Sequence, residues 1–200
     1  MDFKRLFPDI QQNILLKNYT SFKIGGPARY FYKIKSKEGL IKAVKTAKKA
    51  KVPYFILGGG SNVLVSDRGF NGLVIKIQNT RYKTQDTKII AGAGVLLEKL
   101  VNESIKLGLT GLEWAVGIPG TIGGAIRGNA GAFGSSMADV VKNVEVLKLP
   151  KFQVLSFKFQ DLKRGYRDSI FKHNKILIIL SVELELKRGS KEKSQKIIKE

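Results

Sequence analysis

The sequence predicts an α+β protein made of two small units. In the first 78 residues a strand, a helix and two further strands follow one another, which is the order of a small α/β unit. Near the other end, residues 176–186 alternate almost strictly between aliphatic and polar side chains. That alternation predicts a long strand with one solvated face, which is typical of antiparallel sheets. We therefore expect residues 79–187 to combine an antiparallel sheet with helices.

The elements of the first unit follow from local composition. Residues 29–35 are aromatic and alternate toward their end, which indicates a strand. Ser36 opens a predicted helix that continues to about Lys51, with lysines on its outer face. The apolar residues at helical spacing are Leu40, Ile41, Val44 and Ala47. Pro53 ends this region, and two apolar strands are expected at 54–57 and 73–77.

The second unit begins with a strand at 88–91, and a helical stripe of aliphatic residues then runs from Leu96 to Ile105. A hairpin is expected around Pro150, with its strands at 144–149 and 152–157. In the long strand, one face is predicted to carry Ile176, Ile178, Leu180, Val182, Leu184 and Leu186. Residues 188–200 are nearly all polar and are expected to form a charged tail, in which a helix beginning after Ser190 has little to hold it.

The net charge is +20, and 28 of the 36 basic residues are lysines spread along the whole chain. Nucleic-acid binding proteins instead gather arginine and lysine on one face, with aromatic residues between them. The diffuse pattern favours a generally basic surface over nucleic-acid binding, which stays open as an alternative. A basic field would also steer an anionic small molecule toward a cleft.

No cysteine is present, which excludes disulfides, thiolate metal sites and a cysteine nucleophile, and no metal site is predicted. The first eight residues contain no apolar core of signal-peptide length, and the longest aliphatic run spans only 176–180. The sequence therefore predicts a cytoplasmic protein that does not enter the membrane.

The segment Gly58-Gly-Gly-Ser-Asn62 directly follows a predicted buried strand. Consecutive small residues can aim several backbone N–H groups at a phosphate, and Ser61 and Asn62 add side-chain donors. The alternative is a flexible turn between two strands, but three glycines exceed what a turn needs. Neither a P-loop nor the complete G-x-G-x-x-G fingerprint is present, so a Rossmann domain is not supported.

Seven of the 21 glycines lie between Gly117 and Gly134, in a stretch whose one charged side chain is Arg127. Glycine loses more conformational freedom on folding than any other residue, so such a cluster disfavours the fold unless backbone must approach a ligand. The stretch predicts a wall that holds a large, flat cofactor through main-chain groups. The alternative is tight packing of a helix on a sheet.

The segment Gly165-Tyr-Arg-Asp-Ser-Ile-Phe171 surrounds Arg167 with aromatic and acidic residues. An arginine here is suited to bidentate binding of a carboxylate or phosphate, and the alternative is an ion pair with Asp168 or a neighbour. His173 is the single histidine and is expected to be a surface or capping residue rather than a catalyst. Trp114 is expected to be a packing residue.

Four segments together resemble the UDP-N-acetylenolpyruvoylglucosamine reductases of peptidoglycan synthesis. They are Asn18-Tyr-Thr-Ser-Phe-Lys-Ile-Gly-Gly-Pro-Ala28, Leu57-Gly-Gly-Gly-Ser-Asn-Val-Leu64, Gly117-Ile-Pro-Gly-Thr-Ile-Gly-Gly-Ala125 with Asn129-Ala-Gly-Ala-Phe-Gly134, and Tyr166-Arg-Asp-Ser-Ile-Phe-Lys172. They occur in the order and spacing of that family. The resemblance implies an FAD-binding fold of the vanillyl-alcohol-oxidase type, in which two α+β subdomains clasp the flavin.

By match to the family's motifs, the resemblance implies that Gly58 to Leu64 hold the FAD pyrophosphate and that the glycine-rich stretch lines the rest of the cofactor. The implied cofactor-binding residues are Gly58, Gly59, Gly60, Ser61, Asn62, Val63, Leu64, Gly117, Ile118, Pro119, Thr121, Gly123, Gly124, Ala125, Asn129, Ala130 and Gly131. Arg167 is implied as the active-site arginine, and Tyr166 and Arg167 as substrate-binding residues.

The implied activity uses NADPH to reduce FAD and then delivers hydride to the enolpyruvyl double bond of a UDP-sugar. In this family a proton-donating serine and its partner glutamate lie in a C-terminal domain, to which residues 188–200 would lead. The 200 residues contain no segment resembling that domain, which leaves open whether this is the FAD-binding portion of the reductase or the first of two chains, the second of which supplies the domain. The alternative is a flavin-binding protein without complete catalytic machinery.

Overall fold

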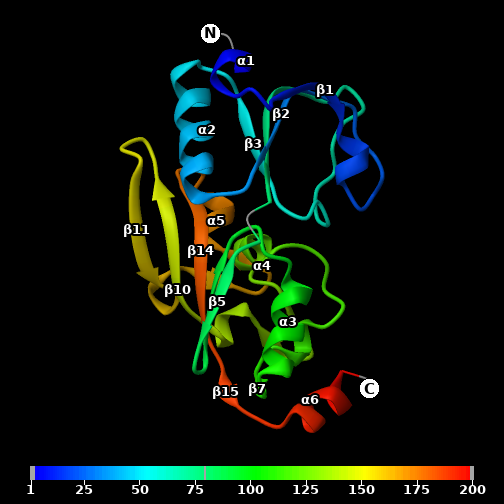
Figure 1. The fold of residues 1–200 in the computed structure, drawn as a ribbon, viewed down its shortest axis with the longest axis vertical. Coiled ribbons are helices and arrows are strands. Elements are labelled where there is room, and N and C mark those ends of the chain that lie inside the picture. The colour runs from blue at the N-terminus through cyan, green and yellow to red at the C-terminus, as the bar shows by residue number, and fades with distance from the viewer. Residues whose placement is uncertain (1–2, 79, 199–200) are drawn as a thin grey trace. The chain divides into compact units, whose positions relative to one another are not determined.

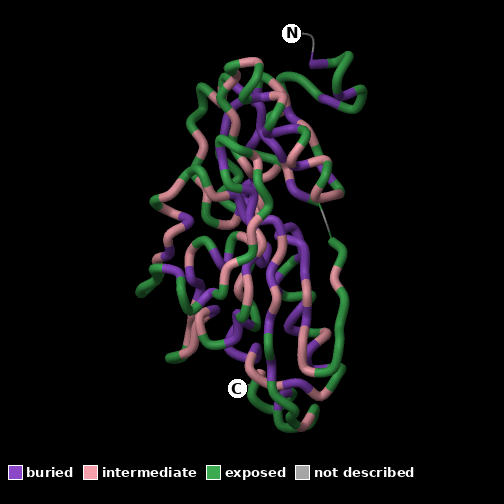
Figure 2. Tube along the Cα trace, turned by 90° about the vertical axis from the view of Figure 1, so that its left-hand side faces the viewer, coloured by how far each residue is buried: buried purple, intermediate pink, exposed green. Residues whose placement is uncertain are grey.

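In the computed structural model, which describes residues 3–78 and 80–198, the chain divides into two units, Met1–Asn79 and Thr80–Glu200 (Figure 1). Each unit has its own sheet and its own helices. In both units the buried residues run through the interior and the exposed residues lie on the outside (Figure 2). Among the described residues, no helix combines the length and the apolarity needed to cross a membrane.

Unit 1 is built on a four-stranded sheet in the order β1-β2-β4-β3. β2 (Pro27–Ile34), β4 (Phe70–Ile77) and β3 (Tyr54–Leu57) are parallel, and β1 (Gln11–Leu15) pairs antiparallel with β2 at one edge. The shorter helices are α1 (Phe3–Leu6) and the 3-10 turn η1 (Leu16–Tyr19). β2, β3 and β4 confirm the three strands expected from the sequence, whereas β1 lay in a stretch without a strand signal.

The helix α2 (Lys37–Lys49) forms where its N-cap residue Ser36 and its apolar stripe predict a helix. The Ser36 side chain accepts a hydrogen bond from the Gly39 N–H at 3.0 Å, which satisfies one of the free donors of the first turn. α2 packs against β4 through Leu40, Ala43, Val44 and Ala47, which are all buried. A second apolar cluster, under η1 and the chain that follows β3, contains Leu16, Ala28, Phe31, Leu57 and Val74.

Unit 2 is built on a five-stranded antiparallel sheet in the order β11-β10-β14-β6-β5. The hairpin β10 (Val141–Lys148) and β11 (Gln153–Lys158) confirms the one expected around Pro150. The remaining strands of the sheet are β5 (Tyr82–Gln85), β6 (Lys88–Gly92) and β14 (Leu177–Glu185). β5 was not expected, because its sequence Tyr-Lys-Thr-Gln has no apolar alternation and its last three residues are exposed.

The long strand β14 confirms the alternation read from the sequence, with one difference at its start. Ile178, Leu180, Val182 and Leu184 are buried, whereas Ile176 lies before the strand and is 41% exposed. On the other face Glu183 forms an ion pair with Lys88 at 3.1 Å, and Glu185 forms one with Lys142 at 2.6 Å. These pairs link β14 to its neighbouring strands β6 and β10.

Helices and short elements surround this sheet. The helix α3 (Leu97–Lys106) confirms the predicted stripe, and α4 (Ile122–Gly128) and α5 (Ile170–His173) pack against β14. The short elements are β7 (Leu109–Thr110), η2 (Glu113–Ala115), β8 (Gly131–Ala132), β9 (Ser135–Ser136), η3 (Met137–Asp139), η4 (Phe159–Asp161), β12 (Arg164–Gly165), β13 (Asp168–Ser169), β15 (Lys187–Arg188) and α6 (Lys191–Ile197).

The last helix, α6, is held more firmly than its polar sequence indicates. Ser194 is 3% exposed, and its hydroxyl donates to the Glu113 carboxylate at 2.5 Å. Burial raises the pKa of Glu113, but hydrogen bonds from Ser194, Thr110 and the Gly111 N–H outweigh it, so the pKa lies below its ordinary value of 4.5. The expectation that this helix has little to hold it is therefore wrong, because a buried polar contact replaces the apolar stripe.

Candidate functional site

The glycine loop of unit 1 leaves the carboxyl end of β3 and is fixed by its own packing. Gly60 has φ +77°, and a Cβ built on it would lie 1.9 Å from the Tyr19 carbonyl oxygen. The Ser21 N–H donates to the Gly60 carbonyl at 3.1 Å, so the loop lies directly on the chain that follows η1. A glycine is required here because a side chain would displace this backbone contact.

A lysine lies beneath the same loop. The Lys76 ammonium of β4 donates a hydrogen bond to the Gly58 carbonyl. Burial lowers the pKa of Lys76 from its ordinary value of 10.5, and the nearby charge of Lys33 lowers it further. Lys76 was not predicted as a site residue, although a lysine inside the apolar run Leu73-Val-Ile-Lys-Ile77 indicates that it has a polar partner on that face.

The other predicted phosphate-binding residues of this loop differ in exposure. Val63 packs against the apolar cluster under η1, whereas Asn62 is exposed and Leu64 is 74% exposed. Gly58, Gly59 and Ser61 are half-buried. The first family-like segment supports the second, because the Tyr19 carbonyl oxygen lies 1.9 Å from where a Cβ on Gly60 would stand. Gly26 of the first segment packs equally closely on the Asp67 carbonyl oxygen, just beyond the loop.

The glycine-rich stretch of unit 2 follows η2 and folds into a short connection, α4 and the strand β8, which pairs with β9 in a hairpin. α4 was not expected, because glycine disfavours helix and occupies three of its seven positions. It is closed at both ends: the Thr121 hydroxyl accepts from the Gly124 N–H at 3.4 Å, and Asn129 ends the helix with φ 41°. Ile122, Ala125 and Ile126 are the buried residues that face the unit's interior.

Two of these glycines are explained by packing. A Cβ on Gly123 would lie 2.9 Å from the Ala93 carbonyl oxygen, where α4 presses on the end of β6. A Cβ on Gly131 would lie 2.5 Å from the Ser135 carbonyl oxygen inside the β8–β9 hairpin. The tight-packing alternative is therefore correct at these positions.

Other glycines of the stretch are not explained by packing. A Cβ on Gly117, Gly128 or Gly134 would meet no atom within 4 Å, and on Gly124 it would meet the Thr121 hydroxyl at an ordinary 3.6 Å. Gly124 and Gly128 also have helical backbone that any residue adopts. Each disfavours α4 by about 0.5–1 kcal/mol relative to alanine, and no packing contact of the fold requires either.

The remaining predicted residues of this stretch differ in exposure. Pro119 is exposed and Ile118 is half-buried, whereas Thr121, Ala125 and Ala130 are buried. A backbone N–H of Ala130 donates to the Ala125 carbonyl at 2.8 Å. Trp114 confirms its predicted packing role: it is 9% exposed, and its indole N–H donates to the Gly111 carbonyl at 3.0 Å.

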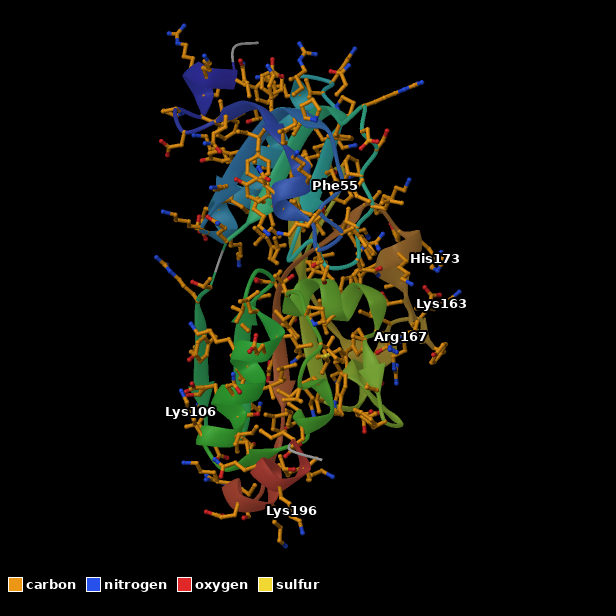
Figure 3. The ribbon with its side chains drawn as sticks, turned by 90° about the vertical axis from the view of Figure 1, so that its right-hand side faces the viewer. Phe55, Lys106, Lys163, Arg167, His173 and Lys196 are labelled. Atoms are coloured by element: carbon orange, nitrogen blue, oxygen red, sulfur yellow. The ribbon has the colours of Figure 1, made fainter. Side chains whose placement is uncertain are left out.

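Tyr166 and Arg167 form the two-residue turn between β12 and β13, because Gly165 pairs with Asp168. Tyr166 is 95% exposed, and Arg167 has φ 53°. Figure 3 shows Arg167 on the same flank of unit 2 as Lys163 and His173. This arrangement presents a guanidinium and a phenol to an anionic ligand from a short, projecting turn.

His173 belongs to the support of that turn. Its Nε2 lies 2.9 Å from each carboxylate oxygen of Asp168, and its side chain is 71% exposed. This hydrogen bond is the largest cause that holds the pKa of Asp168 below its ordinary value of 3.8. Asp168 thus contacts His173, which agrees with the expectation of a surface or capping histidine.

Within unit 2 the fold brings the glycine-rich stretch and the Arg167 turn together. The Asn129 side chain donates to the Gly165 carbonyl at 2.8 Å, and the Ser169 hydroxyl donates to the Arg127 carbonyl at 2.7 Å. Over residues 3–78 and 80–198, no group of three or more His, Asp or Glu side chains is placed to hold a metal ion.

Comparison with known proteins gives a consistent result. A family model described as an FAD binding domain matches residues 28–156. The UDP-N-acetylenolpyruvoylglucosamine reductase of Caldanaerobacter subterraneus subsp. tengcongensis is 44% identical over 186 residues, which are 92% of this chain and 61% of that protein. The reductase of the same name from Alkaliphilus oremlandii is 43% identical over 94% of this chain and 63% of that protein.

Solved structures agree with this fold. The crystal structure of the UDP-N-acetylenolpyruvylglucosamine reductase MurB from Thermus caldophilus matches with a TM-score of 0.80 at 35% identity, over 95% of this chain and 67% of that one. A cholesterol oxidase from Brevibacterium sterolicum matches with a TM-score of 0.65 at 14% identity, which is a likeness of fold alone. The chain spans about three fifths of the length of the curated relatives named above.

Proposed function

Because the chain belongs to the FAD binding domain family and to the UDP-N-acetylenolpyruvoylglucosamine reductases, we propose that it supplies the flavin-binding part of that reductase activity. The proposed reaction is the NADPH-dependent reduction of UDP-N-acetylglucosamine enolpyruvate to UDP-N-acetylmuramate. It would serve peptidoglycan synthesis, and with it cell shape and division, in the cytoplasm.

The observation that carries the proposal is the set of open glycines on α4. Gly124 and Gly128 disfavour the helix and leave room that no side chain of the fold fills. Backbone kept bare in this way suits a flat cofactor that approaches the main chain closely. The residues of this stretch therefore fit the flavin, and we assign to it Gly117 to Ala125 together with Gly128, Ala130 and Gly131.

The loop of unit 1 fits an anionic group. Gly58 to Leu64 combine bare backbone with the Ser61 and Asn62 side chains, and the Lys76 ammonium lies under Gly58. A positive charge and several backbone N–H groups together favour a pyrophosphate. We assign the pyrophosphate of FAD to this loop.

When bound, FAD supplies hydride transfer, taken from NADPH and delivered to the enolpyruvyl double bond. Arg167 would bind the carboxylate of the enolpyruvyl group and stabilise the negative charge that develops on it as hydride adds. Tyr166, almost fully exposed beside it, would pack against the UDP-sugar. The resemblance implies a proton-donating serine in a C-terminal domain, and we propose that such a domain completes the reaction.

Flavin content tests the proposal directly. We expect the purified protein to be yellow, with the absorbance spectrum of a bound flavin that FAD restores after stripping. A colourless protein that takes up no FAD on reconstitution would overturn it. Asn13→Gly changes an exposed residue of β1 that lies outside all four motifs, and it is the control that should retain full FAD.

The rate of NADPH oxidation in the presence of the enolpyruvyl UDP-sugar distinguishes a reductase from a protein that only binds flavin. Turnover, alone or with a chain that supplies the proton donor, supports the reductase. FAD binding without turnover under either condition would instead support the second candidate, a flavin-binding protein without complete catalytic machinery.

A further inference from the structure

The side chain of Asn129 is buried and already engaged. It is 7% exposed and ends α4 in the left-handed region at φ 41°. Its Nδ2 donates to the Gly165 carbonyl at 2.8 Å, and its Oδ1 accepts from the Ala138 N–H at 3.2 Å. A carbonyl and an N–H need opposite ends of an amide, so these two partners fix the orientation of the side chain.

The Gly165 carbonyl is the last one before the Tyr166–Arg167 turn. β12 and β13 contribute only two residues each, and an isolated two-stranded ribbon of that length is marginally stable in water. Arg167 also has the left-handed φ of 53°, which disfavours a non-glycine residue. The geometry of this turn therefore depends on the contacts that hold its base.

Those contacts come from α4 and α5. Asn129 and the Ser169–Arg127 hydrogen bond tie the base of the turn to α4. The Lys172 ammonium donates to the Arg167 carbonyl, and His173 holds Asp168. Of these groups, Asn129 is the one buried side chain that belongs to the glycine-rich stretch assigned to the flavin.

We propose that Asn129 is a positioning residue for Arg167: its amide fixes the turn that carries the guanidinium, and its side chain does not bind the flavin. This rests on the proposed function, which assigns Arg167 to the substrate carboxylate. Bidentate binding of a carboxylate demands a fixed guanidinium plane, so a loose turn weakens substrate binding while flavin binding is retained. The role differs from the one implied for Asn129 by motif match.

Two variants distinguish the role of the Asn129 side-chain amide from the role of its left-handed backbone conformation. Asn129→Gly keeps the left-handed φ without strain and removes both side-chain hydrogen bonds. Asn129→Asp keeps an oxygen for the Ala138 N–H but loses the donor to Gly165. Asn13→Gly is the matched control, because Asn13 is an exposed asparagine at φ 54° in unit 1.

The first measurement is amide hydrogen exchange over residues 164–169 in the FAD-loaded protein, with the FAD-to-protein ratio recorded in parallel. We expect both Asn129 variants to speed exchange in this segment by about tenfold and to retain full FAD, and the control to change neither. An unchanged exchange rate over residues 164–169 would overturn the proposal. So would a loss of bound FAD that accompanies the faster exchange. If the wild-type protein takes up no FAD, the proposed function fails, while exchange in the apoprotein still tests the positioning role.

The second measurement is the dissociation constant of the enolpyruvyl UDP-sugar, followed by the flavin absorbance change. Asn129→Gly should raise it about tenfold in the wild-type background and have no effect in an Arg167→Ala background. An equal effect in both backgrounds would show that Asn129 acts without Arg167 and would overturn the proposal.

Discussion

The two glycine clusters look alike in sequence but are used in opposite ways by the fold. In unit 1, Gly60 and Gly26 are each pressed against a backbone oxygen, 1.9 Å from where a Cβ would lie. In unit 2, Gly123 and Gly131 are also fixed by packing, but Gly117 and Gly128 have open space where a side chain would stand, and Gly124 meets only the Thr121 hydroxyl at an ordinary 3.6 Å. The first cluster shapes the protein, whereas part of the second leaves main chain bare toward the outside of its unit.

This difference teaches that a glycine is informative about a ligand only when the fold does not need it. A glycine forced by packing would be present in a protein that bound nothing at that loop. A glycine in a helix, with ordinary φ and free space around it, carries a cost of about 0.5–1 kcal/mol that the isolated fold does not recover. Such positions point to contacts made by a bound molecule.

The largest expected effect is at Gly60. Gly60→Ala should lower the free energy of unfolding by about 3–5 kcal/mol, because the methyl group meets the Tyr19 carbonyl and the φ of +77° is strained. Gly117→Ala is the control, since it has a similar φ of +72° in open space and should lose only about 1–2 kcal/mol. Chemical denaturation measures both, and equal losses would break the comparison.

Lys76 tests the electrostatic part of the unit 1 loop. Lys76→Met should weaken FAD binding by about tenfold, because it removes the positive charge under Gly58. Isothermal titration at two salt concentrations measures the effect, and the salt dependence should fall in the variant. An unchanged dissociation constant would place the pyrophosphate elsewhere.

The pH dependence of stability gives a second readout for Lys76. Its pKa is lowered in the folded state, so the unfolded chain binds more protons between that lowered value and 10.5. The contribution of Lys76 to stability should therefore rise as the pH increases through that interval, and Lys76→Met should lack the rise. Denaturation of both proteins from pH 7 to 10.5 measures the difference, and parallel curves would contradict it.

The smallest expected effect is the sharpest test of the open glycines. Gly128→Ala should stabilise the apoprotein by about 0.5–1 kcal/mol, since the methyl group fits and the helix gains a better residue. The same variant should bind FAD several-fold more weakly, and Gly124→Ala should behave alike. Thermal unfolding without flavin and titration with FAD measure the pair. A stabilised variant with unchanged FAD affinity would remove the reason for assigning this wall to the flavin.

Local sequence was sufficient for the elements whose pattern agrees with their environment. The stripe of α2, the alternation of β14 and the hairpin around Pro150 all formed where expected. α4 was missed because helix propensity disfavours three glycines in seven residues, while its caps Thr121 and Asn129 were the signals available. The anchoring of α6 was missed because its partner, Glu113, lies 81 residues earlier in the chain.

Sequence motifs named the residues of the candidate site, but they did not indicate which contacts each side chain makes. Motif match grouped Asn129 with the bare glycines, since neighbours in sequence share one pattern. The hydrogen bond from Asn129 to Gly165 spans 36 residues, so only folding shows that this side chain serves the Arg167 turn. Likewise, the need for glycine at position 60 arises from Tyr19, which no local window includes.

In both units the last long strand to be made is an inner strand of the sheet. β4 enters between β2 and β3, and β14 enters between β10 and β6. On the ribosome, where about 5–20 residues are added each second, roughly 30 residues separate the end of β10 from the start of β14. For some seconds the edges of β10 and β6 that later pair with β14 have no partner strand, and such edges can pair with other chains. We therefore expect the yield of folded protein to depend on the speed of translation across residues 149–176.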